Sequence, residues 1–128
     1  MTQPDNLKCL EIALCLINER KFYEETRDYR ESLIKRIGKQ CYIESLAIRG
    51  LDTHIKSAIK SVWFNQYYYS GLKLTKPERA EIASRILTDW LGDYLLETPQ
   101  PSEDEIKAKL KRVKSMLNRG AKFIPIGS

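Results

Sequence analysis

The sequence contains no long apolar run and no evident targeting segment. None of its apolar stretches approaches the roughly 20 residues that a helix needs to cross a bilayer. The first residues, 1–5, lack the basic start and the small-residue cleavage site of a secretory signal. The three cysteines are odd in number, which argues against a disulfide framework. These absences predict a cytoplasmic protein in a reducing setting.

Residues that carry out catalysis or bind metals are also scarce. His54 is the single histidine, and the cysteines Cys9, Cys15 and Cys41 follow no metal-binding spacing. A metal site usually needs several His, Cys or carboxylate ligands at short spacing. The sequence has no glycine-rich phosphate loop and no nucleotide-binding fingerprint. We therefore expect no catalytic residues, no metal site and no cofactor.

The composition is that of a folded domain. Hydrophobic residues make up 42% of the 128 residues and charged residues 30%, which is typical of a globular chain rather than a disordered one. A chain of this length buries roughly two thirds of its unfolded surface. We predict that residues 1–128 form a single helical domain.

Apolar residues recur at helical spacing along most of the chain. This spacing predicts helices at about 5–20, 21–39, 41–70 and 75–94, followed by a basic helix at about 102–119. In the third segment, Gly50 either interrupts the helix or is tolerated at a cost of about 1 kcal/mol. Gly38 is expected near the C-terminal cap of the second helix. The predicted fold is all-α, a single compact bundle of four to five helices.

Two helix starts carry a recognisable capping signal. Thr75 and Glu78 form a capping box, with Pro77 in the first turn where its missing N–H does no harm. After a break at Pro99 and Pro101, Ser102 with Glu105 is predicted to form a second capping box. The last helix is therefore expected to begin at a defined residue.

The last helix carries an excess of positive charge. Seven basic residues and no acidic one follow Glu105, although the net charge of the chain is only +5. Ile106, Leu110, Val113 and Leu117 form an apolar stripe that we expect to dock the helix, with cations on its flanks. Like charges at i,i+4 repel each other, which indicates an anionic partner. A membrane surface is less favoured, because the stripe lacks Trp and Phe.

Other segments extend the predicted basic surface. Lys56 and Lys60 are a like-charged i,i+4 pair, and the end of the second helix is less compensated by acids than its start. The predicted nucleic-acid-binding residues are Lys107, Lys111, Arg112, Lys114, Arg119, Lys122, Lys56, Lys60, Lys35, Arg36 and Lys39. These side chains would contact phosphates without reading base sequence.

A dense aromatic run occupies residues 63–69, with five aromatic residues in seven positions. On a helix they cannot all face one core, and Trp and Tyr are enriched at interfaces. An apolar tail at 121–128 is too short to fold alone. The predicted protein-interface residues are Trp63, Phe64, Tyr67, Tyr68 and Phe123.

The helical pattern, the small size, the basic helices and the absence of a catalytic set resemble the small subunit of CRISPR surveillance complexes. That resemblance implies a helical bundle that contacts a bound or displaced strand inside an antiviral effector complex. We therefore predict a non-catalytic subunit that binds nucleic acid, single-stranded or paired with a guide, beside other protein subunits. The sequence does not distinguish DNA from RNA as the partner, and it leaves self-association open.

Two other functions stay open. Arg49 lies five positions before His54, which resembles the Arg-x4–6-His motif of HEPN-family ribonucleases. That resemblance implies a composite dimeric site that cuts RNA, although Gly50 stands where the family usually has Asn, Asp or His. The third interpretation is a protein-interaction or accessory module that contacts no nucleic acid.

Overall fold

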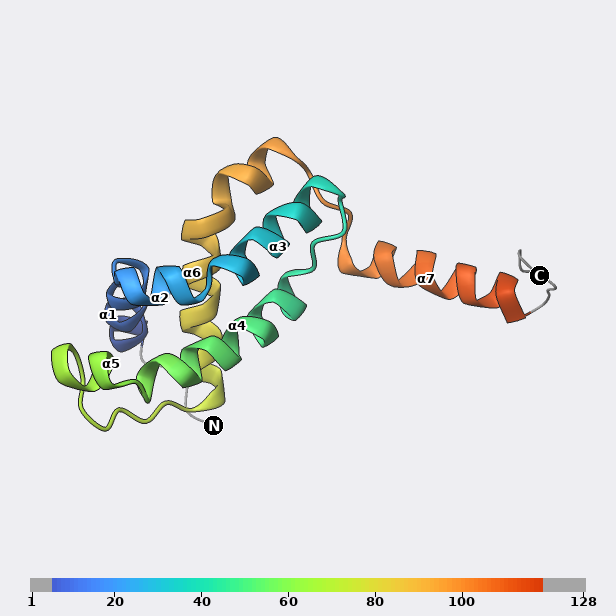
Figure 1. Ribbon diagram of the computed structural model, residues 1–128. Helices are drawn as coiled ribbons and strands as arrows, with labels where there is room; N and C mark the ends of the chain where they lie inside the picture. Colours follow the sequence, from blue (N-terminus) through green and yellow to red (C-terminus); the bar gives the residue numbers. More distant parts are fainter. Residues whose placement is uncertain (1–5, 119–128) are drawn as a thin grey trace.

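The secondary structure is entirely helical in the part of the chain that the computed structural model describes, residues 6–118 (Figure 1). The helices are α1 (Asn6–Ile17), α2 (Arg20–Glu25), α3 (Arg27–Gly38), α4 (Glu44–Ile59), α5 (Val62–Tyr67), α6 (Lys76–Glu97) and α7 (Glu103–Asn118). The all-α prediction is confirmed, but the predicted number of four to five helices is too low within these residues. No helix among them is both long enough and apolar enough to cross a membrane.

The helix α6 lies at the centre of the packed part of the molecule, which we call the body (residues 6–97). It packs against α1 and α4, and over a shorter length against α3. Its buried side chains include the pairs Ile82–Ile86 and Leu87–Leu91, and the i,i+4 spacing places the members of each pair on the same side of the helix. Phe22 and Phe64 fill the core from the short helices α2 and α5. One apolar core therefore joins α1 to α6.

The predicted second helix is two helices, because the chain breaks at Thr26. The Thr26 side chain is buried, and its hydroxyl donates to the carbonyl oxygen of Phe22 at 2.8 Å. Such bonding back to the preceding turn bends or interrupts a helix. Arg30 holds the break by donating to the Thr26 hydroxyl oxygen at 3.3 Å and to the Tyr23 carbonyl at 3.2 Å. No Gly or Pro marks this position, so spacing alone predicted a continuous helix.

The predicted third helix is also divided, although not at Gly50. That glycine lies inside α4, where the ring of Tyr29 packs against its backbone. The break falls after Lys60, where the Ser61 hydroxyl accepts from the N–H of Phe64 at 3.2 Å and caps α5. Gly38 lies near the end of its helix, as expected: it is the last residue of α3, and Lys39 is the C-cap. The left-handed conformation after the helix is taken by Gln40, with φ 57°.

The start of α6 is formed as its sequence predicts. The Thr75 hydroxyl accepts from the N–H of Glu78, and the Glu78 carboxylate accepts from the N–H of Thr75 at 2.8 Å. Both bonds satisfy backbone donors that the first helical turn leaves free. The beginning of α6 also contacts α1, because the Cys9 thiol donates to the Glu78 carbonyl.

Candidate nucleic-acid interface

The helix α7 extends away from the body (Figure 1). In the described part of the chain it does not pack along any other helix. Its first turn is hydrogen-bonded to the body, where the Ser45 hydroxyl donates to the Glu103 carboxylate at 3.0 Å. One of the two bonds of the predicted second capping box is present: the Ser102 hydroxyl accepts from the N–H of Glu105 at 3.1 Å.

The linker before α7 is held to the body by the side chain of Gln100. Its Nε2 donates to the carbonyl oxygens of Ile37 at 2.9 Å and Thr98 at 2.7 Å. Its Oε1 accepts from the N–H of Tyr42 at 3.2 Å. These bonds join the linker to the segment between α3 and α4, so the direction in which α7 leaves the body is defined.

The cations of α7 are exposed to solvent. Lys107, Lys111, Arg112 and Lys114 all lie at the surface, and so does Lys109. Only Lys107 has a carboxylate within reach among these five, Glu103 at 3.5 Å. Arg119, Lys122 and Phe123, which were also predicted to be functional, lie outside the described residues.

The middle of the α7 stripe, Leu110 and Val113, does not dock on the body, contrary to our expectation, whereas Ile106 in the first turns is half-buried. Leu110 is 56% exposed and Val113 is 52% exposed. The reason is the direction of the linker, which carries the helix away from the core (Figure 1). The stripe is therefore open to a partner rather than used for folding.

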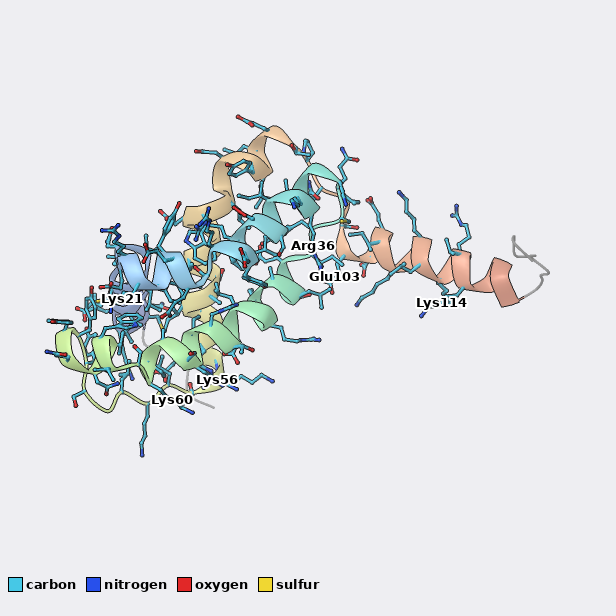
Figure 2. The ribbon with its side chains drawn as sticks, viewed as in Figure 1. Lys21, Arg36, Lys56, Lys60, Glu103 and Lys114 are labelled. Atoms are coloured by element: carbon cyan, nitrogen blue, oxygen red, sulfur yellow. The ribbon has the colours of Figure 1, made fainter. Side chains whose placement is uncertain are left out.

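The remaining predicted cations divide into two regions (Figure 2). Lys35, Arg36 and Lys39 are exposed at the end of α3, close to the linker that precedes α7, because Gln100 bonds to Ile37. Lys56 and Lys60 lie at the far end of α4, well separated from Lys114 (Figure 2). The tertiary structure thus associates the α3 cations with α7 and sets the α4 pair apart.

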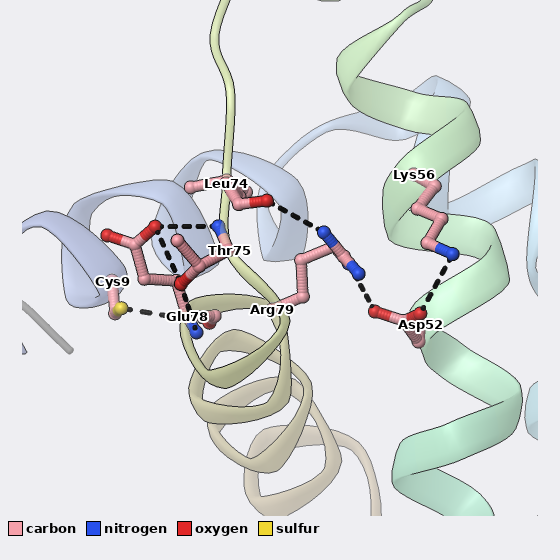
Figure 3. Close-up of polar contacts among 7 residues, drawn as sticks. All are labelled: Cys9, Asp52, Lys56, Leu74, Thr75, Glu78 and Arg79. Atoms are coloured by element: carbon pink, nitrogen blue, oxygen red, sulfur yellow. Dashed lines mark hydrogen bonds and ion pairs between the residues drawn. The ribbon is translucent and has the colours of Figure 1, made fainter. Parts of the chain in front are cut away.

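One of the α4 cations belongs to an ion-pair network between α4 and α6 (Figure 3). Asp52 accepts from Nε of Arg79 at 2.6 Å and forms an ion pair with Nζ of Lys56 at 3.5 Å. Arg79 also donates to the carbonyl of Leu74 at 2.7 Å. Arg79 was not among the predicted site residues, because the adjacency of α4 and α6 cannot be predicted from spacing alone.

Two of the predicted interface aromatics are core residues instead. Phe64 is fully buried and Trp63 nearly so, and their rings meet edge to face at 6.0 Å. Tyr68 donates its hydroxyl to the Glu19 carboxylate at 2.6 Å, which raises the pKa of Tyr68 to about 12. Tyr67 remains 72% exposed. The run divides in this way because α5 has only six residues and turns its first aromatics inward.

Arg49 and His54 are not brought together within the chain. Arg49 is exposed on the side of α4 that faces α6, whereas the His54 ring contacts the Tyr29 ring at 5.1 Å on the α3 side. Burial lowers the pKa of His54 below its ordinary value, so its imidazole is neutral at pH 7. The described residues contain no group of three or more His, Cys, Asp or Glu side chains that could hold a metal ion.

Comparison with protein-family models, with curated proteins and with solved structures gave no match.

Proposed function

We propose that this protein is a non-catalytic subunit that binds the phosphate backbone of nucleic acid inside a larger ribonucleoprotein or nucleoprotein assembly. The observation that carries the proposal is α7: a helix that leaves the body and presents exposed cations over most of its length. Folding of the body does not explain these cations, because α7 packs along no other helix of the described chain. A polyanion would relieve their mutual repulsion.

The apolar stripe supports the second half of the proposal, the larger assembly. Leu110 and Val113 are more than half exposed, and an amphipathic helix with an uncovered apolar side is a common element of helix-in-groove recognition. A protein neighbour would cover this stripe while the flanking cations contact the nucleic acid. Arg36 and its neighbours at the end of α3 would extend the cationic surface toward the body.

Fluorescence anisotropy with labelled 20-nucleotide probes tests the proposed binding to nucleic acid. Single- and double-stranded DNA and RNA should each bind at low salt and dissociate at high salt. The double variant Lys111→Glu, Lys114→Glu should weaken binding at least tenfold. The variant Lys21→Glu, Lys73→Glu makes the same change in net charge at two exposed positions outside the proposed surface, and should bind nearly as tightly as the unmodified chain. Equal losses in both variants would show that α7 is not the binding surface.

A protein-interaction module that contacts no nucleic acid is the second candidate, and the exposed stripe favours it as well. It predicts no change in anisotropy with any probe at low salt. A ribonuclease has less support, since Arg49 and His54 lie on different sides of α4. Loss of RNA cleavage in both Arg49→Ala and His54→Ala would favour that function over the other two.

A further inference from the structure

A groove between α4 and α6 concentrates positive charge at a second place on the molecule. Its volume is about 400 Å³, within the usual range for small-molecule sites. Four cations line it, Arg49 and Lys56 from α4 and Lys76 and Arg79 from α6, and Asp52 is the one acidic residue in the lining. Small side chains, Ser45 and Ala80, leave the space open.

The single carboxylate is already used by two of the four cations. Asp52 pairs with Arg79 at 2.6 Å and with Lys56 at 3.5 Å (Figure 3). For Arg49 and Lys76, no carboxylate of the described residues lies within ion-pair distance. The groove therefore has cationic groups in excess of what its own acid can neutralise.

Arg79 is held in place before any ligand arrives. Its side chain is 15% exposed, and its Nε and Nη1 donate to Asp52 and to the Leu74 carbonyl. A guanidinium has five N–H donors, so three remain, one on Nη1 and two on Nη2, and no acceptor for them is found among the described residues. A donor whose position is fixed loses little side-chain entropy on binding.

The anion that fits this groove is a phosphate group. Two guanidinium and two ammonium groups around one carboxylate favour a multiply charged oxyanion, and Arg matches the geometry of phosphate oxygens. The site consists of side chains rather than of a helix end, because the N–H of Glu78 in the first turn of α6 already bonds to Thr75. We propose that this groove binds a phosphate group, carried either by a small phosphorylated molecule or by a nucleic-acid strand. The evidence lies on α4 and α6, so this site stands apart from the surface on α7.

Titrations followed by ¹H–¹⁵N spectra of the full chain test the site. The probes are inorganic phosphate, a nucleoside monophosphate and a single-stranded oligonucleotide without terminal phosphate, at constant ionic strength. Saturable shifts at the amides of Arg49, Asp52, Lys76 and Arg79 would support the proposal. Saturation with the oligonucleotide alone would identify a strand as the source, and saturation with the small probes would identify a small molecule. No saturable shift in the groove with any of the three probes would overturn it.

Matched variants locate the bound anion. Arg49→Ala with Lys76→Ala should weaken phosphate binding about tenfold or more, which is the effect of removing charge-assisted contacts. Lys21→Ala with Lys73→Ala removes the same charge elsewhere and should leave the affinity unchanged. All four side chains belong to exposed or partly exposed residues, and thermal unfolding of each variant checks its fold. Equal weakening by both pairs would overturn the site.

A third variant separates this site from the proposed function. Lys111→Glu with Lys114→Glu should reduce nucleic-acid binding while inorganic phosphate still shifts the groove amides. If that variant also abolishes the groove shifts, the anion site lies on α7 and the groove proposal fails. If only Arg49→Ala with Lys76→Ala affects the groove, the site stands whether or not α7 binds nucleic acid.

Discussion

At the scale of single residues, Gly50 shows how a neighbour determines which side chain a helix accepts. A Cβ atom built at Gly50 would lie 2.8 Å from Cζ of Tyr29. Tyr29 cannot move away freely, since its hydroxyl donates to the Ala47 carbonyl at 2.7 Å. Burial of the Tyr29 side chain in this contact raises the pKa of its phenol above the ordinary value. A residue that normally weakens a helix is here required by the packing of α3 on α4.

Replacing Gly50 by Ala should therefore destabilise the protein by roughly 1–3 kcal/mol, as overpacking of a close contact does. Gly92 in α6 is the matched control, because a Cβ there would meet nothing within 4 Å. Gly92→Ala should stabilise the protein by up to about 1 kcal/mol through helix propensity. Urea unfolding of the two variants measures both changes. A stabilised Gly50→Ala variant would contradict the contact with Tyr29.

The capping carboxylate of α6 makes stability depend on acid. The bond from the Thr75 N–H, with help from the Thr75 hydroxyl and Lys8, holds the pKa of Glu78 below its ordinary value. A carboxyl group whose pKa is lower in the folded than in the unfolded state stabilises the fold at pH values above its pKa in the unfolded chain. This contribution is lost as the pH falls through the folded pKa. The pH range over which this stabilisation is lost therefore lies below about 4.5.

Glu78→Gln should lower the free energy of unfolding at pH 7 and should have progressively less effect as the pH falls from 5 to 3. Glutamine can still accept from the Thr75 N–H, so the helix start is retained. Glu97→Gln, at the exposed end of the same helix, is the control and should leave the pH profile unchanged. Urea unfolding at several pH values measures this. A difference from the unmodified chain that does not shrink in acid would disprove the role of the Glu78 charge.

At the scale of helices, α7 differs from all the others in what it contributes to folding. The buried stripes of α1, α4 and α6 form the core, whereas Leu110 and Val113 on α7 are exposed. Both kinds of helix have apolar residues at the same spacing. Periodicity could predict each helix but could not distinguish one that builds the core from one that leaves it.

A proline in α7 should consequently spare the body. Ala108→Pro would break α7, at a local cost of about 3 kcal/mol or more, but should shift the melting temperature of the body by less than about 2 °C. Ser84→Pro in α6 should unfold the body, since α6 packs against α1, α3 and α4. Near-ultraviolet circular dichroism reports the body, where Trp63 and Trp90 both lie. A large loss of body stability in Ala108→Pro would show that α7 supports the fold.

At the scale of the whole molecule, the two proposed anion-binding surfaces are separate rather than continuous. The cations of α7 and of the end of α3 lie near the Gln100 linker, whereas Arg49, Lys56, Lys76 and Arg79 line the groove between α4 and α6. A nucleic acid bound at α7 should therefore contact only as many phosphates as the cations of that surface can reach.

The salt dependence of nucleic-acid binding measures that number. Five cations on α7, namely Lys107, Lys109, Lys111, Arg112 and Lys114, are exposed in the described chain. If all five contact phosphates of a single strand, the slope of log K against log salt should be roughly −3.5. The Lys111→Glu, Lys114→Glu variant should give a shallower slope, by at least about 1.4 for two lost contacts. A slope near zero for the unmodified chain would exclude backbone binding.

The sequence by itself determined the helical class, the start of α6 at Thr75 and the exposed cations of α7. Each of these depends on neighbours within a turn or two of helix: capping groups, apolar spacing and charges along one segment. The tertiary structure alone decided the burial of Thr26, Trp63 and Phe64, and the pairing of Asp52 with Arg79. These features depend on residues distant in the chain, because a buried position or an ion pair exists only after two helices have packed together.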